Sequence, residues 1–306
     1  MLALYDNDYA NNYRDTGLKA SLNSNDMKNV MQTEVALQAV AHQDPGIKRK
    51  DKPNEDTLFI TEGVMPARSP SLPPIPFVLL LVADGMGGQA YGRVASRLAA
   101  QSLIQHVFCS LCSQHSPTEL LLSLLEAGVQ YANKVVYERN QRRQISMGTT
   151  MTVTLVIGGT AFVAHVGDSR LYLYHAPTGL TPMTHDHSLV AELVTAGIIA
   201  ADDIYTHPRR NQIYRCLGEH NVVEVDTFSV PLTAGDILLL CSDGLWEMVR
   251  DQHIMDILTV PMSTPSAMAH ALIVAALTGG GHDNVSVIVA QVSEKGSRNM
   301  LTCGSK

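Results

Sequence analysis

The sequence predicts an α+β fold, with a central antiparallel β-sandwich flanked by helices on both faces in four layers (α-β-β-α). Short apolar runs typical of buried strands recur along the chain, and two of them are separated by a hairpin-like turn. Long helical stretches interrupt these runs without the regular strand–helix alternation of a doubly wound fold. The chain has 306 residues, of which 45% are hydrophobic, so it can bury a large core.

Composition divides the chain into three parts. Residues 1–35 are rich in Asn, Asp and Ser and show no sustained periodicity, so we expect a disordered N-terminal tail. Residues 36–293 carry the strand and helix patterns and are predicted to form one globular domain. Residues 294–306 are expected to form a C-terminal tail.

In the first half of the chain, boundary signals place a loop, a strand and a helix. The segment RSPSLPPIP (68–76) is proline-rich and predicts a loop before the apolar strand at 77–83. A helix is predicted over 116–143. Its start carries a capping box in SPTE (116–119), with proline at the first helical position.

The second half of the chain predicts mainly strands. Residues 149–175 are β-rich, with Gly158 and Gly159 as a hairpin turn and 167–169 as the next tight turn. The last predicted elements are a short buried strand at 235–244, a helix at 264–281 and a closing strand at 284–292.

Charge and hydropathy exclude several classes of partner. The formal net charge is -7, which argues against non-specific nucleic-acid binding and against binding to anionic membrane surfaces. No apolar run approaches the ~20 residues that span a bilayer. The N-terminus lacks the basic and apolar regions of a signal peptide, so we expect a cytoplasmic protein without nucleic-acid or membrane partners.

Some motif-like residues favour ordinary structural roles. The five cysteines show no disulfide framework, and Cys109 and Cys112 form a CxxC without a second pair. His185 and His187 resemble a zinc pair, but such residues at a helix start more often cap the helix. The GMGG segment lacks the Lys-Ser/Thr of a phosphate-binding P-loop.

Aspartates recur at the ends of apolar strands or in turns beside them. Like charges at one rim of a sheet raise one another's pKa, which is costly unless cations lie between them. Oxygen ligands select Mg²⁺, Mn²⁺ or Ca²⁺, and the glycines that follow two of the aspartates would leave room for ions and substrate. Any single Asp-Gly is usually a turn, and one aspartate could simply pair with Arg170. The aspartates are Asp56, Asp84, Asp168, Asp243 and Asp283.

The motifs that contain these aspartates resemble those of the protein phosphatase 2C family of metal-dependent Ser/Thr phosphatases, in its bacterial single-domain form. Seven short motifs occur in the family's order across residues 36–293. They are NED (54–56), VADGMGG (82–88), GTTM (148–151), HVGDSRLYL (165–173), DHS (186–188), CSDGLWEMV (241–249) and GHDNVSVIV (281–289).

The resemblance implies a centre of two Mn²⁺ or Mg²⁺ ions. Asp84 would bridge both ions, and the carbonyl of Gly85 would bind one of them. Asp243 and Asp283 would hold one ion, and Asp56 would hold the other, directly or through water. The family's β-sandwich also agrees with the predicted layers.

The resemblance further implies a third, weaker metal position shared by Asp168 and Asp243. Residues 187–217 resemble the family's mobile flap and the segment beside it, where Arg209 and Arg210 are candidate contacts to a protein substrate or a solvated charge pair.

Two positions depart from the family pattern. Extra residues separate NED from the arginine that binds phosphate in the resembling family, so Arg49 is predicted for that role, with Lys50 or Lys52 as substitutes. A solvated basic patch is the alternative. Met86 occupies the position where animal members carry a histidine proposed as general acid, and a methionine cannot donate a proton.

The implied function is hydrolysis of phosphoserine and phosphothreonine monoesters by direct attack of a metal-bridging water, with Asp84, Asp243 and Asp283 as catalytic residues. Phosphoproteins, including a Ser/Thr kinase or its targets, are the expected partners, and a monomer is the expected state. One alternative is a catalytically inactive phosphatase-like binding module. Another is a metal-dependent phosphodiesterase or nuclease, which the acidic balance disfavours.

Overall fold

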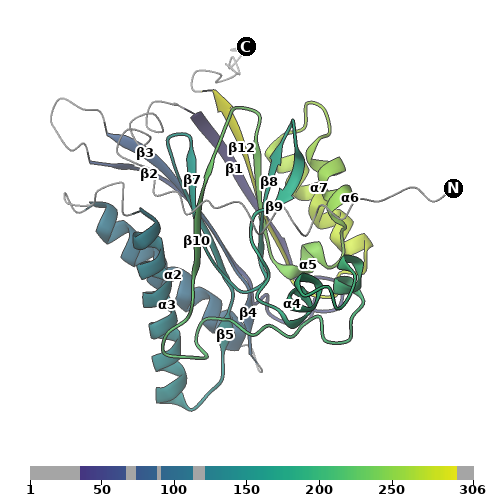
Figure 1. Cartoon of the computed structure of the whole chain (residues 1–306). Coiled ribbons are helices and arrows are strands. Elements are labelled where there is room, and N and C mark those ends of the chain that lie inside the picture. Colours follow the sequence, from purple (N-terminus) through teal and green to yellow (C-terminus); the bar gives the residue numbers. More distant parts are fainter. Residues whose placement is uncertain (1–34, 67–73, 88–90, 113–120, 295–306) are drawn as a thin grey trace, which may run out of the picture.

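The computed structural model describes residues 35–66, 74–87, 91–112 and 121–294. These residues form two stacked five-stranded sheets between two layers of helices (Figure 1). The predicted tails, except for their innermost residues 35 and 294, and the predicted capping box lie outside the described residues.

The first sheet is antiparallel throughout, with the strand order β10-β7-β6-β3-β2. Ile157 pairs with Thr160 across a two-residue turn, which confirms the predicted glycine hairpin. The strands are β2 (Thr57–Met65), β3 (Ile75–Ala83), β6 (Met151–Ile157), β7 (Thr160–Val166) and β10 (Asp226–Pro231).

The second sheet has the order β1-β12-β11-β8-β9 and is also antiparallel. The turn at 167–169 does not make a hairpin, because β7 belongs to the first sheet and β8 to the second. The strands are β1 (Val35–Asp44), β8 (Arg170–His175), β9 (Gly179–Pro182), β11 (Ile237–Cys241) and β12 (Val285–Glu294).

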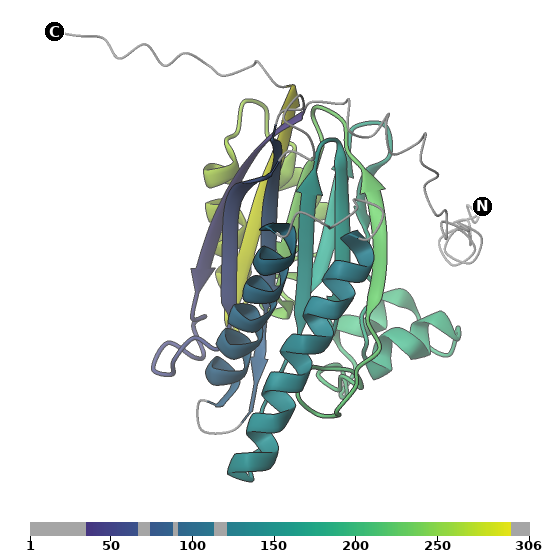
Figure 2. The same cartoon turned by 90° about the vertical axis from the view of Figure 1, so that its left-hand side faces the viewer.

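Helices cover the outer face of each sheet. Helices α2 (Tyr91–Cys112) and α3 (Leu121–Arg143) lie side by side across the first sheet, as Figure 2 shows. The second sheet is covered by α5 (Asp243–Trp246), α6 (Asp251–Leu258) and α7 (Pro265–Thr278). Thr264 caps α7 by accepting from the amide of Ala267 at 3.2 Å.

The apolar runs of the sequence are strands that are buried on both faces. In β3, Leu79 and Leu81 belong to the core beneath α2 and α3, whereas Leu80 and Val82 belong to the core between the sheets. In β11, Leu239 faces the helices of the second sheet while its two leucine neighbours face the first sheet. Because alternate side chains point to opposite faces, both faces need apolar residues. The predicted four-layer α+β fold is confirmed.

The proline-rich segment ends earlier than the sequence predicts. Strand β3 begins at Ile75 and therefore includes Pro76, which pairs with Val64 of β2. Pairing with β6 begins only at Phe77, so Pro76 need not donate a hydrogen bond on that side. Two short strands, β4 (Gly85–Met86) and β5 (Gly148–Thr149), pair beside the end of β3 and were not predicted.

Among the helices in the described ranges, none is long and apolar enough to cross a membrane.

Candidate active site

The strand registers bring the five predicted aspartates to one end of the sandwich. In the first sheet, Thr57 pairs with Ala83, so Asp56 and Asp84 stand opposite each other just beyond the ladder. Because β3 also runs antiparallel to β6 and β6 to β7, the start of β6 and the end of β7 lie at this same end. The turn that carries Asp168 therefore leaves the first sheet there.

The second sheet contributes its aspartates at the same end. Cys241, the last residue of β11, pairs with Val287 of β12 and with Arg170 of β8. Asp243 follows the end of β11, and Asp283 precedes the start of β12. Asp168 lies between the sheets, on the turn that leads into β8. Residues far apart in sequence thus share one rim.

The carboxylates at this rim raise one another's pKa. Burial raises the pKa of Asp84 well above its ordinary value, and repulsion from the four other aspartates raises it further. Burial likewise raises the pKa of Asp243, with added repulsion from Asp168, Asp283, Glu247 and Asp56. The ionised form of these carboxylates is therefore energetically unfavourable at this rim.

Asp56 and Asp168 are the most enclosed members of the cluster, 6% and 7% exposed. Burial raises the pKa of Asp56 to about 6 and that of Asp168 to about 7. Ser242 donates to Oδ2 of Asp56 at 2.9 Å. Oδ1 of Asp56 and Oδ1 of Asp243 are buried without a hydrogen-bond partner among the described residues.

These features fit a site for hard cations, because the donors are oxygens and two of them are buried and unpaired. Among the residues that the structure describes, no group of three or more His, Cys, Asp or Glu side chains is arranged so that it could hold a metal ion.

The glycines after two of the aspartates serve backbone packing. A Cβ on Gly85 would lie 2.1 Å from the carbonyl oxygen of Gly92 in α2. A Cβ on Gly244 would lie 2.0 Å from the carbonyl oxygen of Asn284. These glycines therefore also allow a close contact between neighbouring backbones, which a Cβ would prevent.

Two threonines of the GTTM motif hold the backbone of Asp84. Thr150 Oγ1 accepts from the Asp84 amide at 2.9 Å, and its own amide donates to the Asp84 carbonyl at 2.8 Å. Thr149 Oγ1 donates to the same carbonyl at 2.8 Å. The motif was visible in the sequence, but its side chains carried no assigned role. The structure shows that they orient the aspartate at the end of β3.

Arg49 lies at the same rim, where it forms ion pairs with Glu55 and Asp283. Burial opposes its charge, yet these two carboxylates raise the pKa of Arg49 above its ordinary value. The loop that carries it is fixed to the Asp283 loop, since Lys48 donates to the Gly281 carbonyl at 3.0 Å. The side chains of Lys50 and Lys52 are exposed.

Arg170 does not pair with Asp168 by hydrogen bonds. Its guanidinium donates to both carboxylate oxygens of Asp186, with distances from 2.7 to 3.2 Å. It also stacks 3.8 Å above the ring centre of Trp246, whose Nε1 donates to the Asp168 carbonyl at 2.9 Å. The alternative in which Asp168 pairs with Arg170 is thus wrong. Asp186 of the HDH motif binds Arg170 instead.

Helix α4 (Leu189–Thr195) and the 3₁₀ helix η3 (Ala201–Tyr205) lie within the segment that resembles a flap. Ser188 caps α4 by accepting from the Ala191 amide at 3.3 Å, as the capping interpretation of this region expects. Arg210 lies 3.5 Å from Glu247. The exposed Arg209 donates its amide to His207. The Met86 side chain is partly exposed beside the Asp84 end of β3.

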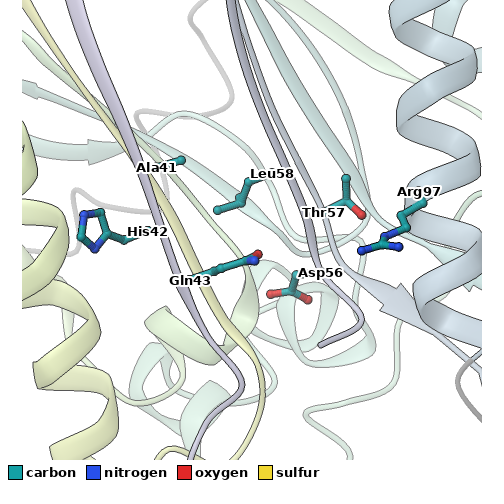
Figure 3. Close-up of a pocket in the computed structure, with 7 residues that line it drawn as sticks. All are labelled: Ala41, His42, Gln43, Asp56, Thr57, Leu58 and Arg97. Atoms are coloured by element: carbon teal, nitrogen blue, oxygen red, sulfur yellow. The ribbon is translucent and has the colours of Figure 1, made fainter. Parts of the chain in front are cut away.

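A cavity of about 410 Å³ opens on the side of the sandwich between the edge strands β1 and β2 (Figure 3). His42 and Gln43 of β1 line one wall, and Arg97 of α2 lines another. Asp56 also borders it, so this aspartate lies between the carboxylate cluster and the cavity.

Comparisons with known proteins agree with this arrangement. The sequence profile described as protein phosphatase 2C matches residues 49–273. The serine/threonine phosphatase stp of Listeria welshimeri is 39% identical over 229 residues, which are 74% of this chain and 86% of that protein. The protein phosphatase PstP of Mycobacterium tuberculosis is 37% identical over 260 residues, 84% of this chain and 45% of that longer protein.

Solved structures show the same fold. The catalytic domain of PstP, crystallised in complex with two manganese ions, superposes with a TM-score of 0.69 and 34% identity, over 85% of this chain and 99% of that one. Stp1 from Staphylococcus aureus superposes with a TM-score of 0.73 and 30% identity, over 85% and 97% of the two chains. With matches of this extent in sequence and in structure, the chain belongs to the protein phosphatase 2C family of serine/threonine phosphatases.

Proposed function

We propose that this chain hydrolyses phosphoserine and phosphothreonine monoesters in proteins, using divalent cations held by the carboxylate cluster. The observation that carries the proposal is the convergence of five aspartates at one end of the sandwich, where burial and mutual repulsion raise the pKa of Asp84 and Asp243. Such an arrangement is stable with its charge intact only when cations compensate it.

Mn²⁺ or Mg²⁺ is the proposed cofactor, as two core ions and a third, weaker one. Asp84 and the Gly85 carbonyl would hold core ions together with Asp243 and Asp283. Asp56 would complete the core, and Asp168 would share the third position with Asp243. Bound there, the cations would activate water as a nucleophile and neutralise phosphoryl charge. Support comes from the unpaired buried oxygens of Asp56 and Asp243.

Arg49 is the proposed phosphate-binding residue. Its guanidinium carries several N–H donors in a planar fork, which suits the oxygens of a phosphoryl group. Glu55 and Asp283 hold this fork at the rim, so its orientation is set before substrate arrives. Met86 has no proton to give the leaving oxygen. The proposal therefore assigns Met86 no role in proton transfer.

Replacing Arg49 by alanine is expected to lower kcat/KM for a phosphopeptide by about 10- to 100-fold, because hydrogen bonds to charged groups contribute about 1.5–3 kcal/mol. Most of the loss should appear as a higher KM, measured by steady-state kinetics. Lys50→Ala and Lys52→Ala are matched controls, since both lysines are exposed and lie on the same loop. A larger loss in either control would move the phosphate role to that lysine.

We place the catalytic domain at residues 36–293, between tails at 1–35 and 294–306. We propose a cytoplasmic monomer that acts on a Ser/Thr kinase or on the targets of such a kinase. Charge supports the absence of nucleic-acid binding, since the chain carries a formal net charge of -7.

Hydrolysis of a phosphothreonine peptide by the purified chain tests the proposed function. Phosphate release is expected with Mn²⁺, is expected to stop with excess EDTA, and should return when Mn²⁺ is restored. Release that is insensitive to chelation would contradict a metal-dependent reaction. Binding of Mn²⁺ by calorimetry without release from any phosphopeptide would instead favour a non-catalytic binding module.

A further inference from the structure

The turn that carries Asp168 is held through its backbone from several sides. Trp246 Nε1 donates to the Asp168 carbonyl at 2.9 Å. The hydroxyl of the next residue, Ser169, lies 2.7 Å from Thr150 Oγ1, on the threonine that fixes Asp84. Thr152 Oγ1 donates to the Ser169 carbonyl at 3.0 Å. Further support comes from His187, at the start of the segment that resembles a flap.

His187 makes two hydrogen bonds to Gly167, the residue before Asp168. Its amide donates to the Gly167 carbonyl at 2.8 Å, and its ring Nδ1 accepts from the Gly167 amide at 3.0 Å. Gly167 has φ +111°, and a Cβ there would lie 2.6 Å from a side-chain carbon of Thr150. The turn therefore needs both glycine and an acceptor for the glycine amide.

The contacts of the His187 ring define which nitrogen carries its proton. Because Nδ1 accepts from Gly167, the proton lies on Nε2, which is 3.2 Å from Oδ2 of Asp226. Arg215 Nη1 donates to the other oxygen of Asp226 at 2.9 Å. Arg215 Nη1 and His187 Nε2 are also 2.9 Å apart. Arg215 Nη1 and His187 Nε2 both carry a proton, so neither accepts a hydrogen bond from the other. Both nitrogens instead lie within hydrogen-bond distance of the Asp226 carboxylate.

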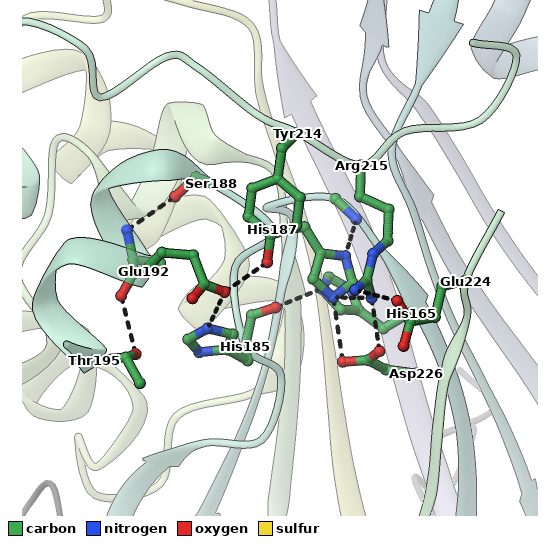
Figure 4. Close-up of polar contacts among 12 residues, drawn as sticks. His165, His185, His187, Ser188, Glu192, Thr195, Tyr214, Arg215, Glu224 and Asp226 are labelled. Carbon is green, nitrogen blue, oxygen red and sulfur yellow. Dashed lines mark hydrogen bonds and ion pairs between the residues drawn. The ribbon is translucent and has the colours of Figure 1, made fainter. Parts of the chain in front are cut away.

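The same histidine closes the base of the segment at 188–213. The Tyr214 amide donates to the His187 carbonyl at 3.0 Å, and the Leu189 amide donates to the Gln212 carbonyl at 2.9 Å. Figure 4 shows the ring of His187 between Tyr214, Asp226 and His165. The His187 side chain is only 2% exposed, so its position is fixed by these neighbours.

His165 packs beside His187 with the ring centres 4.9 Å apart. Its Nε2 donates to the His185 carbonyl at 3.1 Å. Burial, together with the adjacent His187 ring, lowers the pKa of His165 to about 4. The two imidazoles thus pack together beneath the segment, with the His187 side chain only 2% exposed.

We propose that His187 is a positioning residue that fixes the Gly167–Asp168 turn through Nδ1 and couples this turn to the base of segment 188–213. A protein substrate that contacts this segment would then act on the Asp168 position through His187. The part that concerns catalysis rests on the proposed phosphatase function.

Two isosteric variants separate the two ends of the ring. In His187→Asn, the amide oxygen can replace Nδ1 as the acceptor for Gly167. In His187→Gln, the amide nitrogen can replace Nε2–H as the donor to Asp226, but the acceptor for Gly167 is lost. His185→Asn is the matched control, because the neighbouring His185 side chain is 43% exposed and lies 3.8 Å from Glu192.

Hydrogen exchange of the Gly167 amide, followed by NMR, is a measurement that does not depend on enzymatic activity. We expect protection in the wild type, in His187→Asn and in His185→Asn, and at least about tenfold faster exchange in His187→Gln. Mn²⁺ titration by calorimetry should show that the weakest binding step falls about 10- to 100-fold in His187→Gln alone, as for other residues that orient metal ligands. The kcat should follow the same order, with KM little changed.

Equal behaviour of His187→Asn and His187→Gln in amide exchange would overturn the proposal. If a variant does not fold, the ¹⁵N shifts of the wild-type ring decide, since a proton on Nδ1 would contradict the acceptor role. A wild-type protein that is inactive on every phosphopeptide would contradict the proposed function. The amide-exchange result would still test the positioning role of His187.

Discussion

Asp243→Asn is expected to lower kcat by at least about a hundredfold while the protein remains folded. The change removes one negative charge from the proposed metal centre, and metal-ion catalysis contributes several kcal/mol to transition-state stabilisation. In the metal-free protein the same change should raise the midpoint of thermal unfolding. Asp243 is repelled by Asp168 and Asp283 and has a buried, unpaired oxygen, and a neutral amide avoids that repulsion.

Asp236→Asn is the matched control for this prediction. Asp236 is 2% exposed and precedes the same strand β11, but it binds the Thr233 amide at 2.8 Å and His175 at 2.7 Å. We expect the opposite pattern there, with kcat within about twofold of wild type and a lower unfolding midpoint. Near wild-type turnover in Asp243→Asn, measured with saturating Mn²⁺, would remove Asp243 from the catalytic centre.

The layered fold could be predicted because each buried strand carries its own signal. Runs such as FVLLLVA are apolar at every position, and the structure explains this by placing helices on one face and the other sheet on the opposite face. The partner of each strand was harder to predict. The tight turn predicted at 167–169 crosses between the sheets, and the sequence did not show this because pairing across space is not encoded in one tight turn.

The acidic rim was predictable for a similar reason, since an aspartate after a buried strand must lie at an end of the sheet. The residues that hold the backbone of that rim in place were not predictable. Thr150, His187 and Trp246 act through hydrogen bonds to backbone atoms of Asp84, Gly167 and Asp168, respectively, and such bonds depend on distances that sequence spacing does not define. Their motifs were recognised, but only the carboxylates in them suggested a chemistry.

Arg170→Met is expected to lower the free energy of unfolding by about 3–5 kcal/mol, the usual cost of leaving one partner of a buried ion pair uncompensated. The side chains of Arg170 and Asp186 are 10% and 4% exposed. Burial alone would lower the pKa of Arg170, but Asp186 raises it well above its ordinary value, so the arginine stays charged. Urea unfolding followed by Trp246 fluorescence measures the loss.

Arg142→Met is the control, because Arg142 pairs with Glu138 on the surface of α3 and its side chain is 76% exposed. That change should alter the free energy of unfolding by less than about 0.5 kcal/mol.

The double variant Arg170→Met/Asp186→Leu should be more stable than Arg170→Met alone, since no buried charge is left unpaired. If instead the double variant loses the sum of both single effects, the pair is not an isolated unit. Its stability would then depend on the wider network, in which Arg170 also stacks on Trp246 and donates to Tyr172 at 2.8 Å.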